Sequence, residues 1–80
     1  MAYDRSGILV QTVVEILCEI RKEKGISMNK LAWMSGVSAK GIAFIEQGTN
    51  SPTLRNICRI ADALGVDLPQ PFAKAEKRVN

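Results

Sequence analysis

Two cysteines and the absence of histidine limit the chemistry open to this chain of 80 residues. Cys18 and Cys58 both lie in apolar segments with helical periodicity, where a small buried thiol is the ordinary finding. A structural zinc site needs four ligands at short spacings, and the commonest general base is histidine. We therefore expect no metal site, no cofactor site and no catalytic residue, and an enzyme is the least favoured class of function.

Basic residues are concentrated in the middle of the chain. From Ile20 to Ile60 there are seven lysines and arginines against two glutamates, a local charge of +5, whereas the whole chain carries +3. A basic centre on a small domain is typical of proteins that bind a polyanion such as a nucleic acid. Because solvated lysines are common on any surface, the charge is informative only beside a motif.

The stretch from Leu31 to Gly48 supplies such a motif, because it has the pattern of two short helices joined by a tight turn. Ser27 and Ser38 stand where side-chain oxygens cap helices over 28–35 and 39–47. The turn between them contains glycine, and Gly48 can end the second helix in the left-handed conformation. Two short helices across such a turn form a helix-turn-helix.

Two charged residues fall on helix faces that are otherwise apolar. Arg21 lies on the apolar side of the first expected helix, and Glu46 lies near Ile42 on the inward side of the 39–47 helix. A guanidinium or carboxylate directed toward a core needs a partner there. We predict an ion pair between Arg21 and Glu46 that links the first helix to the third.

The remaining helices are expected on either side of this motif. Ser6 is predicted to cap a first helix that runs to about Lys24. Thr53 or Ser51 caps a fourth helix that ends at 64–65, with Leu54 in its apolar stripe. A last element of one or two helical turns follows Pro69.

The fold class predicted from these elements is all-α: a compact bundle of about five helices forming a single domain over residues 1–80. Strand patterns are absent. No apolar run approaches the length of about 18 residues that suggests a membrane span, and the first residues lack a signal-peptide pattern. We therefore expect a cytoplasmic protein with no membrane partner.

The segment 20–68 resembles the lambda-repressor/Cro-like helix-turn-helix family, also called the xenobiotic-response-element-type regulators. The resemblance covers about 49 of the 80 residues, and several short motifs coincide in order and spacing. They are Arg21, Lys24-Gly25-Ile26-Ser27, Leu31-Ala32, Gly36-Val37-Ser38, Ile42, Ile45-Glu46-Gln47-Gly48, Pro52 and Ala63-Leu64-Gly65-Val66. Each motif alone is weak, but together they are specific.

The resemblance implies a five-helix domain that binds operator DNA as a symmetric homodimer, with the third helix in the major groove. It also implies that the residues matching Arg21 and Glu46 form a structural ion pair. Phosphate contacts carried onto this chain are Ser27, Met28, Asn29, Thr49, Asn50, Ser51 and Arg55. Base contacts are Ser38, Ala39, Lys40, Gly41, Phe44 and Gln47.

Several of these residues have a second interpretation. Lys40 can donate to guanine and Gln47 can pair with adenine, but Lys40 can also be solvated and Gln47 can meet only the backbone. Phe44 can pack on a thymine methyl group, on the first helix, or on a second protomer. Gly41 either permits a close approach to DNA or is simply tolerated. Met28 stands where the family commonly has glutamine, which places its phosphate contact in doubt.

Exposed apolar and aromatic residues favour association. Trp33 lies on a normally polar side of the second helix, and Ile8 to Val14 extends the first helix beyond the resemblance. We expect part of this extension to form a homodimer contact with Phe72 and Val79.

The function predicted is a DNA-binding transcriptional regulator, a repressor of a near-palindromic operator on double-stranded DNA. The alternative is a protein-interaction module on the same fold, an antitoxin-like or anti-repressor partner. In that reading Trp33 and Phe44 form a patch for a protein partner and binding to DNA is weak.

Overall fold

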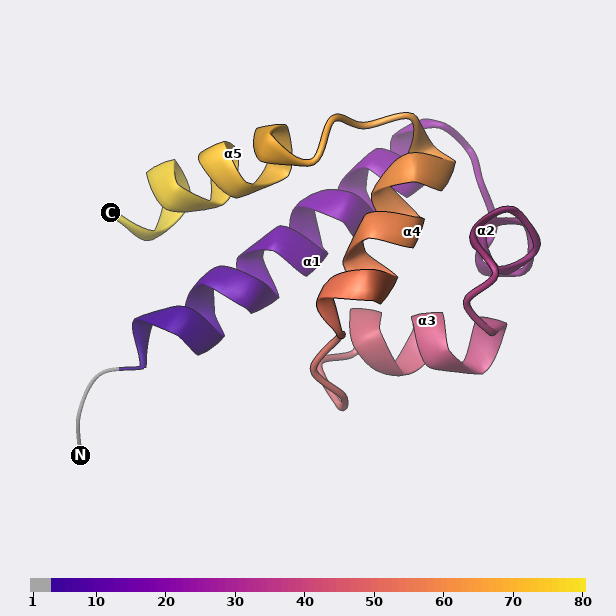
Figure 1. Cartoon of the computed structure of the whole chain (residues 1–80), viewed down its shortest axis with the longest axis horizontal. Helices are drawn as coiled ribbons and strands as arrows, with labels where there is room; N and C mark the ends of the chain where they lie inside the picture. Colours follow the sequence, from indigo (N-terminus) through magenta and orange to yellow (C-terminus); the bar gives the residue numbers. More distant parts are fainter. Residues whose placement is uncertain (1–3) are drawn as a thin grey trace.

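A computed structural model describes residues 4–80 and confirms the all-helical prediction. Within that part of the chain there are five α-helices and no strand. They are α1 (Arg5–Glu23), α2 (Met28–Ser35), α3 (Ala39–Glu46), α4 (Leu54–Leu64) and α5 (Pro69–Val79). Figure 1 shows α5 running back along α1, while α2 and α3 lie beyond α4.

Three helices begin at the caps that the sequence predicts. The hydroxyls of Ser27, Ser38 and Thr53 accept hydrogen bonds from N–H groups in the first turns of α2, α3 and α4, at 3.0, 2.9 and 3.1 Å. Gly36 ends α2 with a φ of 78°, a left-handed conformation that glycine adopts without a steric penalty. These local signals set both ends of α2 and the first residue of α3.

The cap of α1 differs from the prediction. Asp4, not Ser6, caps α1: its carboxylate accepts hydrogen bonds from the Gly7 N–H at 3.1 Å and the Ser6 hydroxyl at 2.7 Å. These hydrogen bonds, that of Ser6 foremost, lower the pKa of Asp4. A charged acceptor suits the positive end of a helix dipole, and Ser6 is left inside the first turn.

The last element is longer than predicted. In place of one or two turns, α5 is a helix of 11 residues in which Pro71 and Ala75 are buried. It packs along α1 and covers much of the apolar extension of that helix. Phe72 packs against the core of its own chain and is half-buried, whereas Ile8 stays 42% exposed.

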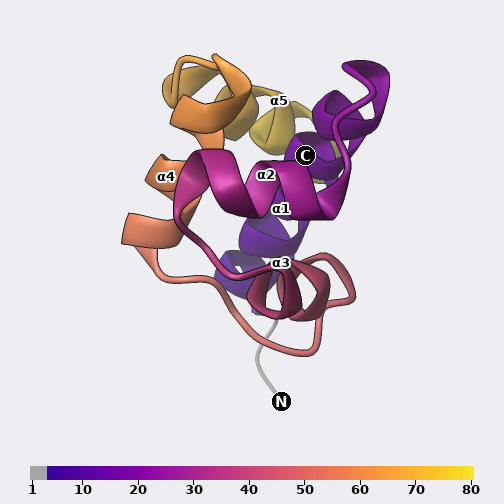
Figure 2. The ribbon, with the colours of Figure 1, turned by 90° about the vertical axis from the view of Figure 1, so that its right-hand side faces the viewer.

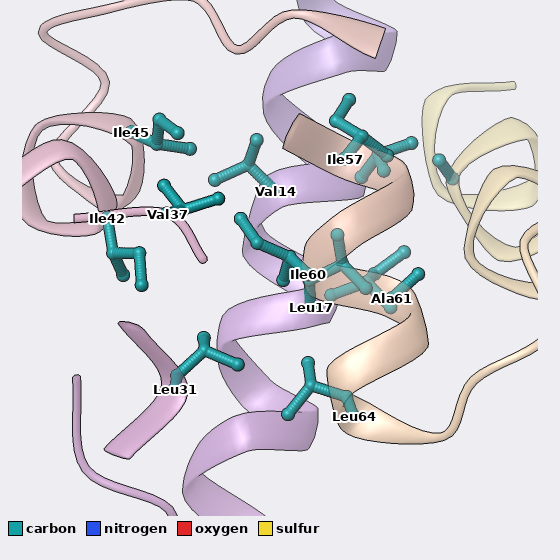
Figure 3. Packing of buried hydrophobic residues seen from close by; sticks show 13 residues of the cluster. Val14, Leu17, Leu31, Val37, Ile42, Ile45, Ile57, Ile60, Ala61 and Leu64 are labelled. Carbon is teal, nitrogen blue, oxygen red and sulfur yellow. The ribbon is translucent and has the colours of Figure 1, made fainter. Parts of the chain in front are cut away.

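The core is formed by side chains from all five helices and from the turn before α3. Ile42 and Ile45 of α3 are part of this buried core, and Figure 3 shows Val14 of α1 pointing toward the side of Val37 and Ile45. Full burial of an isoleucine contributes about 1.5–3 kcal/mol. The two isoleucines therefore seat α3 on the bundle by one face and leave its opposite face free.

Residues 4–80 include no helix with both the length and the apolar character needed to cross a membrane.

Candidate nucleic-acid interface

A buried ion pair fixes α3 to the end of α1. The Arg21 guanidinium donates to Glu46 through Nε at 2.8 Å and Nη2 at 2.9 Å, and its Nη1 donates to the Ile26 carbonyl at 2.8 Å. The two side chains are 8% and 12% exposed. Hydrogen bonding to Glu46 raises the pKa of Arg21 above its ordinary value. This two-point contact restrains rotation as well as position, because a planar guanidinium matches a carboxylate in one orientation.

The turn between α2 and α3 sets the direction of α3. The Gly36 N–H closes α2 on the Ala32 carbonyl, and the Val37 N–H donates to the Ser35 hydroxyl at 3.1 Å. Val37 is buried in the core beside Ile42. With Val37 held there, the chain enters α3 at Ser38 with its direction determined, and Figure 2 shows α2 crossing above α3.

The predicted base-contact residues lie on α3 or at its two ends. Lys40 and Gln47 are exposed, whereas Ala39, Gly41 and Phe44 are half-buried. The helix ends at Glu46, so Gln47 is its C-cap rather than its last helical residue. Lys40 Nζ lies 5.6 Å from the centre of the Phe44 ring. The outward face of α3 therefore offers one ammonium group, one amide and one aromatic ring.

Gly41 has a local structural role. Its N–H donates to the Ser38 hydroxyl at 2.9 Å, and a Cβ added at Gly41 would lie 2.9 Å from that same oxygen and 3.6 Å from Val37 Cγ1. The Ser38 hydroxyl is thus engaged as the cap of α3. A side chain at position 41 would have to displace it.

The predicted phosphate contacts fall into two groups. Ser27, Met28 and Asn29 form the N-terminus of α2, whose first N–H groups have no partner within the helix. The side chain of Met28, whose phosphate contact was in doubt, packs against the core because it lies on the same helix face as Leu31 and Ala32. Its backbone N–H remains at the helix end, where anions are favoured.

The second group is the loop after α3, where Thr49, Asn50 and Ser51 are exposed, together with Arg55 at the start of α4. The N–H groups of Thr49 and Asn50 both donate to the Phe44 carbonyl, at 3.0 and 3.3 Å. These bonds tie the loop to the last turn of α3. The loop is thus held next to α3, on the side of the molecule away from α5 (Figures 1 and 2).

Two large apolar residues, Leu54 and Trp33, are strongly exposed, and only the exposure of Leu54 differs from the prediction. Leu54 is 67% exposed although we placed it in the stripe of α4, because it is the first residue of that helix and lies beyond the core. Trp33 is 86% exposed, which agrees with its expected place on a normally polar side of the second helix. Its position opposite Leu31 on a short helix was the signal for exposure.

The two cysteines are less buried than we expected from the sequence. Both are free and half-buried, and burial raises the pKa of the Cys18 thiol, the larger effect, with a further contribution from Glu46. Within residues 4–80 no group of three or more cysteine, aspartate or glutamate side chains is placed to hold a metal ion.

Comparison with known proteins gives one consistent answer. A helix-turn-helix family model matches residues 19–70. The HTH-type transcriptional regulator PuuR of Escherichia coli is 33% identical over 61 residues, covering 76% of this chain and 33% of PuuR, and PuuR of Shigella flexneri matches equally. The chain thus spans about a third of the length of these relatives.

A solved structure agrees with the sequence comparison. The crystal structure of a point mutant of the restriction-modification controller protein C.Esp1396I superposes with a TM-score of 0.81 at 27% identity, covering 89% of this chain and 92% of the other. The match includes all-helical architecture as well as the motif. The chain belongs to the Cro/C1-type helix-turn-helix family of DNA-binding transcriptional regulators.

Proposed function

We propose that this protein is a sequence-specific repressor that binds a near-palindromic operator as a homodimer, with α3 in the major groove. The observation that carries the proposal is the seating of α3. Its inward face is fixed by Ile42, Ile45 and the Arg21–Glu46 pair, while Lys40 and Gln47 are exposed on the outward side. A helix held rigidly on one face and free on the other is suited to groove insertion.

The outward side chains of α3 suggest how bases are read. The Lys40 ammonium can donate to O6 or N7 of guanine, and the Gln47 amide can form two hydrogen bonds with adenine. Ala39 and the Phe44 ring can contact the methyl group of thymine. Because α3 carries few hydrogen-bonding side chains, discrimination also depends on apolar contact and on the shape of the DNA.

Phosphate binding is supported by the two groups that flank α3. The N-terminus of α2 offers free N–H groups and a partial positive charge, and the loop at Thr49 to Ser51 offers exposed polar groups beside Arg55. Such contacts release counterions, so affinity should fall steeply with salt.

A homodimer suits the small outward face of α3, because one helix reads only a few base pairs. Two copies related by a two-fold axis would place their recognition helices in successive major grooves, about 34 Å apart. A dimer bound in this way represses by occupying the DNA, which needs no further surface on the protein.

The experiment that tests the proposal is selection of bound sequences from a random pool of double-stranded DNA at physiological salt. We expect enrichment of a motif with two-fold symmetry. K40A should then lower operator affinity on the order of tenfold, since a specific base contact is worth about 1–3 kcal/mol. K74A is the matched control, because Lys74 is an exposed lysine on α5, away from α3.

Each part of the proposal can fail separately in this experiment. Enrichment of a single half-site would contradict the homodimer, and equal losses for K40A and K74A would remove Lys40 from base reading. The alternative function, a protein-interaction module, is favoured by the 86% exposure of Trp33. It requires that the pool yield no motif and that binding to DNA be weak for every sequence.

A further inference from the structure

We infer that Phe44 is a positioning residue that holds the Lys40 ammonium for its contact with a base. The inference rests on the proposed DNA-binding function and deepens it. The Lys40 Nζ lies 5.6 Å from the centre of the Phe44 ring, within the range of about 6 Å over which a cation is attracted to an aromatic face.

The helix geometry makes this contact a property of α3 itself. Lys40 and Phe44 are four residues apart, the spacing at which side chains meet on one helix face. A long side chain on a helix leans toward the N-terminus, so the ring of Phe44 extends over the turn that carries Lys40. The contact therefore needs no other element to form.

Phe44 is half-buried although it does not pack against the hydrophobic core within residues 4–80. An aromatic ring that lies next to the aliphatic part of a lysine side chain excludes water from it. The ring thus acts on Lys40 rather than on the stability of the bundle.

Lys40 is free to respond to the ring. In the part of the chain that the structure describes, the salt bridges join Arg5 to Glu76, Arg21 to Glu46 and Arg78 to Glu19, so no carboxylate holds Lys40. A lysine side chain loses about 2 kcal/mol of rotamer entropy when it is fixed. Attraction to the ring restricts the Lys40 side chain before DNA binds. The ammonium group has three N–H donors, so it can still donate to O6 or N7 of guanine.

The role of the Phe44 ring can be tested without disturbing the loop, because the loop is bonded to the backbone of Phe44 and not to its side chain. The loop bonds run from Thr49 and Asn50 to the Phe44 carbonyl, which every amino acid retains. Replacement of the ring alone therefore leaves the loop closed. F44L removes the aromatic face and keeps an apolar side chain, whereas F44Y keeps the face.

The experiment is a double-mutant cycle on operator DNA. Affinities of the parent, F44L, F44Y, K40A and the F44L/K40A double variant are measured for the selected operator and for random DNA, after melting curves show that each variant is folded. We expect F44L to weaken operator binding about two- to fivefold, the effect of about 0.5–1 kcal/mol for an exposed cation–aromatic pair. F44Y keeps the aromatic face and should lose less operator affinity than F44L, and F44L should cause no further loss in the K40A background.

A different pattern would overturn the inference. Equal losses from F44L in the parent and K40A backgrounds would show that Phe44 acts independently of Lys40. In that case affinities are also measured for operator DNA with uracil in place of thymine. If F44L then causes no loss of affinity, the thymine methyl group is the target of Phe44. No loss for F44L would also reject the inference. Failure of the parent to distinguish operator from random DNA would instead reject the proposed function.

Discussion

The α1 helix makes ionic contacts with two helices, and the two sets of contacts differ in their surroundings. At its C-terminal end Arg21 pairs with Glu46 of α3, and these side chains are 8% and 12% exposed. On its other face Glu19 pairs with Arg78 of α5, and these side chains are 52% and 45% exposed. Arg5 and Glu76, also between α1 and α5, are similarly open to solvent.

This difference determines what each ion pair contributes. A charge in a buried site cannot regain its hydration when its partner is lost, whereas exposed charges remain hydrated with or without a partner. The contact of α1 with α3 therefore depends on its ion pair. The contact with α5 depends on buried apolar atoms, among them Pro71 and Ala75, while its ion pairs lie at the edge.

The largest expected effect comes from breaking the buried pair. E46A leaves the Arg21 guanidinium without its carboxylate and should lower the free energy of unfolding by about 3 to 5 kcal/mol. Thermal and urea unfolding measure the change. E23A removes an exposed glutamate at the end of α1 and serves as the control.

A second variant shows whether the stranded charge is the cause. R21M/E46M replaces both partners by apolar side chains, which often costs much less than loss of one partner. We expect its stability to lie closer to the parent than that of E46A. Unfolding of E46A at the same urea concentration as E23A would contradict the structural importance of the pair.

A smaller effect is expected from overpacking the contact between α1 and α5. Ala75 is 0% exposed, so A75L should force neighbouring side chains apart and destabilise the fold by about 1–3 kcal/mol. A73L adds the same atoms at an exposed position of α5 and should leave the stability almost unchanged. Similar melting temperatures for the two variants would show that α5 is not held by close packing.

The smallest effect is expected for the exposed pair. The hydrogen bond from Arg78 lowers the pKa of Glu19 below its ordinary value of 4.5. A carboxyl group with a lowered folded-state pKa contributes stability above its unfolded value and loses it as the pH falls through the folded value. R78A should thus melt slightly below the parent at pH 7, and this difference should disappear in acid. A loss of stability as large as that of E46A would show that the exposed pair contributes as much to folding as the buried pair.

The features predictable from the sequence were those set by a few neighbouring residues. Helix ends depend on atoms within one turn, so the residue types there are enough to predict them. Examples are the caps at Ser27, Ser38 and Thr53 and the glycine at the end of α2. The inward direction of Arg21 followed from helix periodicity, which is reliable for a long helix such as α1.

The features that were missed depend on tertiary contacts or on competition between similar groups. The length of α5 is set by its packing along α1, and its two prolines and basic tail suggested only a short element. At the start of α1 we predicted Ser6 as the cap, but the carboxylate of Asp4, two residues earlier, takes that role. The contact of Lys40 with Phe44 follows ordinary four-residue spacing, but we assigned Phe44 to a thymine methyl, the first helix or a protein partner and not to its neighbour on α3.

Arg21 also has a consequence for how the molecule folds. Its guanidinium joins the end of α1, the segment at Ile26 before α2, and Glu46 at the end of α3. Two of these attachments lie 5 and 25 residues away along the chain. The orientation of α3 therefore depends on its contact with the end of α1 as well as on the turn before it, so a chain in which α1 is undocked would lack this restraint on α3.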